Sequence, residues 1–192
     1  MKKLLLLLLA IPTLAHSQSN QASSSEDIKI ALDTELDGYR TIATEEKRVA
    51  HNGTYPFNMA IIAIKKDGQT QKEYSIKFQL QVFDKRLSVK KGQKVLFKKS
   101  NGETITLQTN DDIYQHPGYR SRDIYTNIIT IGATNQQLQN IIKGNITKIR
   151  ISTDDAQLID ADISDNILSK TLKAELDAVE AAFKSNKLYE NF

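Results

Sequence analysis

The chain has 192 residues, 26 basic and 23 acidic side chains, a net charge of +3 and no cysteine. This length suits one domain that buries its own core. The absence of cysteine excludes disulfides, thiolate catalysis and cysteine-based zinc sites. A nucleic-acid partner is not indicated, because such proteins normally carry a strong basic surplus.

Residues 1–17 have the pattern of a secretory signal peptide. Two lysines precede an apolar run over residues 4–14, and the small residues Ala15 and Ser17 follow it. The apolar run is too short for a transmembrane helix. We therefore expect cleavage after Ser17, with cleavage after Ala15 also allowed, and a periplasmic or secreted protein. We expect no lipid anchor, because that anchor needs a cysteine at the cleavage site.

Strand patterns dominate the rest of the chain. Residues 18–27 are polar and serine-rich, which is typical of a disordered lead-in, and residues 28–192 are assigned to a single β-rich domain. Apolar and polar side chains alternate over 74–82, and Asp67-Gly68 predicts a hairpin back to the apolar run over 59–66. Further predicted strands cover 28–32, 39–44, 94–99, 103–109 (turning at Asn101-Gly102), 123–132, 145–153 and 157–164.

Two helices are predicted near the C-terminus. The first begins at Thr134 with a capping-box sequence and ends at Gly144. The second covers about 165–185 and places five large apolar side chains on one face, which must be buried. The predicted fold class is mainly β (α+β): a curled antiparallel sheet, sandwich or half-barrel, with one short helix and a C-terminal helix packed on the sheet. The apolar stripe consists of Leu168, Leu172, Leu176, Val179 and Phe183.

Two segments, Val89 to Leu107 and Ile129 to Thr153, carry a recurring pattern. They contain a Lys-Gly, strand, Asn-Gly, strand hairpin and an ITKIRI strand. The pattern resembles small exported β-rich proteins of gut-type Gram-negative bacteria that have no assigned activity. The resemblance implies a β-rich fold and a bacterial cell envelope, and it supplies no catalytic residue.

The segment DDIYQHPGYRSRDIY, residues 111–125, is the preferred binding candidate. It is longer than a hairpin connection requires, and long loops in compact domains are often functional. Its aromatic and guanidinium groups suit carboxylates or sugar hydroxyls. The alternative interpretation is a long turn whose tyrosines cover the core and whose arginines pair with nearby aspartates. The predicted ligand-binding residues are Tyr114, His116, Tyr119, Arg120 and Arg122.

A calcium site is the alternative hypothesis for the acidic stretch before the C-terminal helix. Asp160, Asp162 and Ser164 fall at alternate positions, like the first ligands of a calcium loop. Position six is Asp165 instead of glycine, and position twelve is Thr171 instead of glutamate. The competing interpretation is a strand with outward carboxylates, after which Ser164 or Asp165 caps the helix. No metal, cofactor or catalytic residue is assigned, and His51 is interpreted as a loop residue.

A basic run occupies residues 85–99. Such runs usually form a solvated face that protects strand edges from pairing with other chains. The alternative is docking to acidic glycans, lipopolysaccharide phosphates or anionic lipid through attraction that salt screens. The run contains Lys85, Arg86, Lys90, Lys91, Lys94, Lys98 and Lys99, with Asp84 as its counter-charge.

These observations favour an exported, non-enzymatic binding or accessory protein of the cell envelope. Its expected ligand is a protein or a glycan, and the sequence leaves its oligomeric state open. One alternative is a small glycosidase-like hydrolase, which would need converging carboxylates in a cleft. Another is a purely structural envelope subunit, which would expose a large apolar patch on a sheet face.

Overall fold

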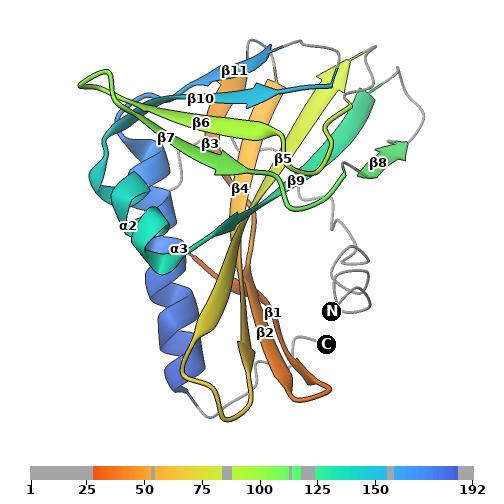
Figure 1. The fold of residues 1–192 in the computed structure, drawn as a ribbon, viewed down its shortest axis with the longest axis vertical. Coiled ribbons are helices and arrows are strands. Elements are labelled where there is room, and N and C mark those ends of the chain that lie inside the picture. The colour runs from red at the N-terminus through yellow and green to blue at the C-terminus, as the bar shows by residue number, and fades with distance from the viewer. Residues whose placement is uncertain are drawn as a thin grey trace.

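The computed structural model describes residues 28–52, 55–83, 88–112, 114–117, 124–154 and 158–185. The predicted signal peptide and lead-in lie outside these residues. The described chain is mainly β, with antiparallel sheets that do not close into a barrel and two helices, one of them C-terminal. This confirms the predicted fold class, and Figure 1 shows the arrangement.

The strands are β1 (Ile30–Leu36), β2 (Tyr39–Thr44), β3 (Lys47–Asn52), β4 (Tyr55–Lys66), β5 (Lys72–Phe83), β6 (Lys94–Lys99), β7 (Thr104–Gln108), β8 (Tyr114–Pro117), β9 (Ile124–Ala133), β10 (Ile146–Ser152) and β11 (Leu158–Asp162). The helices are α2 (Asn135–Lys143) and α3 (Ile167–Lys184).

The long β4–β5 hairpin organises the sheet. On its other side, β4 pairs with β3 over its first half and with β2 over its second half. The main strand order is β7-β6-β10-β11-β3-β4-β5-β9-β8, and β1 pairs with β2 beside it. The sheet curls so that the end of β7 approaches β9. An isolated bridge between Thr109 and Ile131 joins the two. The sheet is therefore strongly curved and encloses most of the core.

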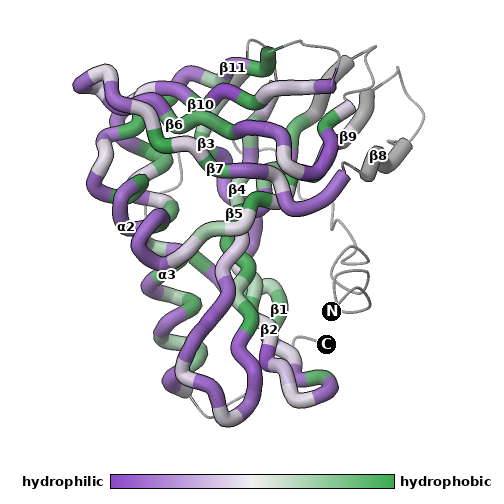
Figure 2. Tube along the Cα trace, in the orientation of Figure 1, coloured by the Kyte–Doolittle hydropathy of each residue, from purple (hydrophilic) through white to green (hydrophobic). Residues whose placement is uncertain are grey.

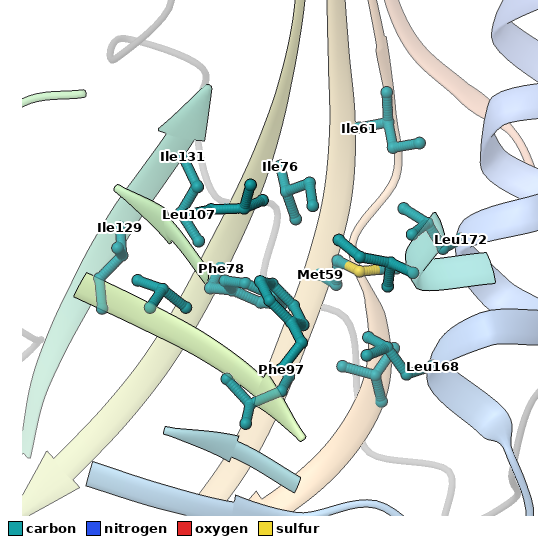
Figure 3. Close-up of a cluster of buried hydrophobic side chains, with 14 of the residues drawn as sticks. Met59, Ile61, Ile76, Phe78, Phe97, Leu107, Ile129, Ile131, Leu168 and Leu172 are labelled. Carbon is teal, nitrogen blue, oxygen red and sulfur yellow. The ribbon is translucent and has the colours of Figure 1, made fainter. Parts of the chain in front are cut away.

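Aromatic side chains from three strands meet inside the curved sheet. The Phe57 and Phe78 ring centroids lie 4.9 Å apart, and those of Phe78 and Phe97 lie 6.2 Å apart. Figure 3 shows Phe78 and Phe97 facing each other, with Leu168 and Leu172 of α3 pointing toward β4. Along β5, alternate residues are buried, as the alternating pattern predicts.

Both helices pack as the sequence predicts. The α3 stripe from Leu168 to Val179 is buried, and Phe183 is partly buried against the same core. The helix contacts β2, β3, β4 and α2. Figure 2 shows hydrophobic residues concentrated where α3 meets the sheet and hydrophilic residues at the tip of the β4–β5 hairpin. The α2 helix begins at the predicted capping box and ends at Gly144.

Two local predictions are wrong. His51 belongs to β3, because the first half of β4 and the end of β11 offer it backbone partners, namely Pro56 and Asp162. Neither Ser164 nor Asp165 caps α3, whose N-cap is Asn166 without a side-chain hydrogen bond. Asp165 and Asn166 instead adopt positive φ angles of 51° and 57° in the turn after β11.

The basic run also differs from its predicted placement. It was expected to lie along a strand edge. Instead, β6 lies between β7 and β10 and pairs with both.

Replacing Leu172 with alanine tests the packing of α3. The side chain is fully buried, so its truncation should lower the free energy of unfolding by about 2–5 kcal/mol. Lys173→Ala on the exposed side of the same helix should change it by no more than about 0.5 kcal/mol. Urea unfolding monitored by circular dichroism measures both, and equal effects would contradict the packing described above.

Candidate functional site

The predicted binding segment is only partly described. Tyr114 and His116 belong to β8, where their backbones pair with Ile128 and Thr126 of β9. Tyr119, Arg120 and Arg122 lie outside the described residues. Part of the segment is thus a short edge strand, and its role in binding stays a prediction.

The acidic residues of the calcium hypothesis are paired with cations of β10. Arg150 donates two hydrogen bonds to Asp160, at 2.6 and 2.7 Å, and these lower the pKa of that carboxyl. Lys148 lies 3.5 Å from Asp160 and 3.2 Å from Asp162. Within the described part of the chain, no group of three histidine or acidic residues could hold a metal ion. Calcium at these carboxylates would have to displace their cations.

A polar groove of about 610 Å³ lies elsewhere, where β5, β9, α2 and α3 converge. Four of its lining residues are cross-strand partners on β5 and β9, namely Tyr74–Ala133 and Ser75–Gly132. The chain passes from β9 directly into α2, so the start of this helix forms a wall. The lining residues are Thr70, Gln71, Lys72, Glu73, Tyr74, Ser75, Asn110, Gly132, Ala133, Thr134, Asn135 and Glu180.

One wall carries a hydrogen-bonded group of three side chains. The Tyr74 hydroxyl donates to Glu180 Oε1 at 2.5 Å, and Lys72 forms an ion pair with Glu180 Oε2. Burial favours a raised pKa at Glu180, but Lys72 and Tyr74 outweigh it and lower the pKa. Burial and the adjacent Glu180 raise the pKa of Tyr74. Glu180 is therefore a carboxylate and Tyr74 a neutral donor at neutral pH.

Asn110 builds the opposite wall. Its Oδ1 accepts a hydrogen bond from the Gly132 amide at 2.9 Å, and its Nδ2 donates to Ser75 Oγ at 3.4 Å. A Cβ atom on Gly132 would lie 2.6 Å from Asn110 Oδ1. Glycine is thus required here so that the carboxamide can lie against the β9 backbone.

The start of α2 is fixed by its capping box. The Thr134 amide donates to Gln137 Oε1 at 2.8 Å, and Thr134 Oγ1 accepts from the Gln137 amide at 3.2 Å. These reciprocal hydrogen bonds fix the backbone at the start of the helix. The next residue, Asn135, is exposed and lines the groove.

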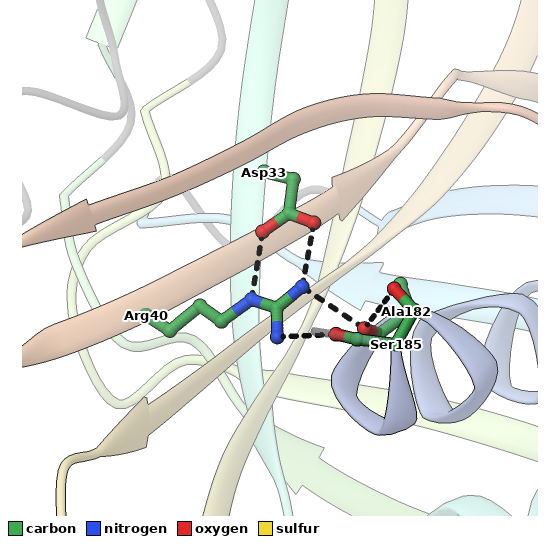
Figure 4. A network of polar contacts seen from close by, with 4 residues as sticks. All are labelled: Asp33, Arg40, Ala182 and Ser185. Carbon is green, nitrogen blue, oxygen red and sulfur yellow. Dashed lines mark hydrogen bonds and ion pairs between the residues drawn. The ribbon is translucent and has the colours of Figure 1, made fainter. Parts of the chain in front are cut away.

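A second polar network holds the C-terminal end of α3, the helix that carries Glu180. Figure 4 shows the four residues of this network. Arg40 donates to both carboxylate oxygens of Asp33, at 2.9 and 2.8 Å, and to the carbonyls of Ala182 and Ser185. These carbonyls lie at the negative end of the helix, where a cation is favourable. The Phe183 ring lies 5.6 Å from Arg40 Cζ and 5.0 Å from Lys72 Nζ. The network therefore fixes the position of Glu180.

A buried carboxyl lies in the interface between α3 and the sheet. Glu175 is fully buried, and neither carboxyl oxygen has a hydrogen-bond partner among the described residues. Burial raises its pKa well above 4.5, and the nearby Thr44 hydroxyl, Lys47 ammonium and Ile61 amide offset only part of this effect. Glu46 adds a further small increase. The protonated form is thus favoured in the folded chain.

No pattern in the sequence predicts the groove. Its residues come from four separate segments, 70–75, 110, 132–135 and 180, and no spacing along the chain connects them. Two local signals were available: the alternation through Tyr74 and the capping box at Thr134. Neither could show that α3 brings Glu180 to the same place.

The chain matches no family model, no curated protein and no solved structure with which it was compared. Within the described residues, neither helix has the length and apolar character needed to cross a membrane.

Glu175→Gln gives a pH-dependent prediction. Because the folded-state pKa is raised, the carboxyl should cost the wild type stability as the pH rises above its unfolded value of about 4.5. Glutamine does not titrate. The melting temperature of the variant minus that of the wild type should therefore increase as the pH rises from 4.5 to 8. Melting temperatures across this range provide the measurement. A difference independent of pH would contradict the assignment.

Gly132→Ala tests the wall built by Asn110. The new methyl group must displace the carboxamide, which loses hydrogen bonds worth about 0.5–1.5 kcal/mol each. We expect a lower melting temperature, and Asn110→Ala in the same background should add little further loss. Additive losses would show that the two residues act independently.

Proposed function

We propose that this chain is an exported, non-enzymatic binding protein of the cell envelope whose ligand is a glycan held in the groove between β5, β9, α2 and α3. The polar lining of the groove is the observation that carries the proposal. Ten of its twelve residues have polar side chains, so the groove offers hydroxyls, carboxamides, carboxylates and an ammonium group. The expectation of export rests on the N-terminal sequence alone.

The arrangement of the lining groups favours a ligand rich in hydroxyls. Thr70, Gln71, Thr134 and Asn135 are exposed at the mouth and can both donate and accept hydrogen bonds. The deeper Tyr74 and Glu180 are held by each other and by Lys72, so their orientation is set before a ligand arrives. Preorganised polar groups lose little conformational freedom on binding.

A hydrolase is the less favoured candidate for the same groove. Glu73 and Glu180 both line it, and a glycosidase needs one carboxyl with a raised pKa to protonate the leaving group. The pKa of Glu180 is lowered by Lys72 and Tyr74, which suits hydrogen-bond acceptance better than proton donation. This supports binding without hydrolysis.

The predicted segment 111–125 would contribute a separate contact. β8 pairs with β9 near Thr126, whereas the groove lies near Gly132 on the same strand. Six residues of extended strand separate these positions, which corresponds to roughly 20 Å. A ligand of several sugar units could span both, and a single sugar could not.

Gln71→Ala/Asn135→Ala tests the proposal, with Gln69→Ala/Asn140→Ala as the matched control. All four side chains are exposed, and the control pair lies outside the groove. On a glycan array followed by calorimetry, the groove variant should bind its glycan on the order of tenfold more weakly, because two hydrogen bonds are lost. The control should bind like the wild type, and both should keep their melting temperatures.

Three results would contradict the proposal. The first is a wild type that retains no glycan, and the second is equal binding by the groove and control variants. The third is the release of new reducing ends from the bound glycan that stops in Glu180→Gln, which would favour the hydrolase.

A further inference from the structure

We infer that the outward face of strands β6, β7 and β10 binds an anionic polysaccharide, at a surface separate from the groove. The register of the sheet defines this face. Val95 and Phe97 of β6 and Ile149 and Ile151 of β10 are buried in the core. The residues that alternate with them point outward, namely Lys94, Leu96 and Lys98 on β6 and Lys148 and Arg150 on β10.

The positive charge on this face is neutralised on one side only. Asp160 and Asp162 of β11 pair with Arg150 and Lys148 of β10. Lys94 and Lys98 on β6 are exposed and have no acidic partner among the residues that the structure describes. The adjacent β7 contributes uncharged side chains at positions 104, 106 and 108, all exposed. The half of the face over β6 and β7 is therefore positive and rich in hydrogen-bonding groups.

The register also places two like charges directly opposite each other. Lys98 of β6 and Lys148 of β10 are cross-strand partners, an arrangement that destabilises a sheet. Asp160 and Asp162 draw the Lys148 ammonium toward β11, which leaves Lys98 facing solvent. An anionic group above Lys98 would compensate the repulsion.

Protection of a strand edge does not explain these lysines. Exposed lysines usually serve that purpose on edge strands. β6 is an interior strand, because its backbone pairs with β7 on one side and with β10 on the other. Lys94 and Lys98 therefore lie in the middle of the face, where a ligand can contact them.

The spacing and chemistry of the face favour a polymer of anionic sugars. Lys94 and Lys98 are four residues apart on one strand, which corresponds to roughly 13 Å. A single small anion cannot contact both, whereas a chain with repeated carboxylate or sulfate groups can. A membrane surface is less suitable, because insertion needs apolar side chains. The face carries the half-buried Leu96 of β6, and the exposed Leu158 lies beside it on β11.

Salt-dependent retention on immobilised heparin, a sulfated polysaccharide, and on polygalacturonate, a carboxylated one, tests this inference. Lys94→Ala/Lys98→Ala should elute at clearly lower salt than the wild type. Lys170→Ala/Lys173→Ala removes the same net charge from exposed positions on α3 and should elute with the wild type. The slope of log affinity against log salt concentration should become less steep by about two units in the β6 variant alone, because two ion pairs are lost. Circular dichroism checks that all variants are folded.

Three outcomes would overturn the inference. The wild type could fail to bind either polymer, or both double variants could lose binding equally, which would indicate attraction by net charge alone. The wild type could also bind vesicles containing anionic phospholipid more tightly than either polysaccharide. None of these depends on the groove, because the groove variant Gln71→Ala/Asn135→Ala should bind the polyanions like the wild type.

Discussion

The packing of α3 against the sheet is the interaction on which the rest of the structure depends. The apolar stripe of this helix is buried, and the helix contacts β2, β3 and β4. Burial of such side chains is the main favourable contribution to folding. β4 pairs with β2 over one half of its length and with β3 over the other half. The helix packs on both of these short strands as well as on β4. This packing and the Arg40 network together place Glu180 beside Tyr74.

Two polar groups in the same interface have opposite effects on the stability of the fold. Arg40 satisfies Asp33 and the last carbonyls of α3 together, so the C-terminal end of the helix is held by well-oriented, partly buried hydrogen bonds. Glu175, near the middle of the helix, has no such partner among the described residues, and its burial costs stability that the apolar contacts must offset. A leucine at this position would pack without that cost. The raised pKa of Glu175 predicts that the stability of this interface depends on pH.

The groove and the basic face arise in different ways. The groove forms where the ends of four elements meet, and its shape depends on the close approach of Asn110 to Gly132. The basic face is a regular sheet surface, and its charge pattern follows directly from strand register. A neutral hydroxyl-rich ligand suits the first and an extended anionic polymer suits the second. Together they would let one small protein hold two kinds of polysaccharide.

The sequence by itself determined the elements with strong local patterns. The alternation around Phe78, the stripe through Leu172 and the capping box at Thr134 all predict structure that is observed, because each depends on neighbours within a few residues. The inward direction of Ile159, Ala161 and Ile163 was predictable for the same reason.

Tertiary structure alone decided the features that join distant segments. His51 lies in a strand because β4 and β11 supply its backbone partners. β6 is an interior strand because β10, about fifty residues later in the chain, pairs with it. Glu180 reaches Tyr74 because α3 folds back across the sheet. Local propensity carries no information about such contacts, since their energy appears only when the core closes and the strand order is fixed.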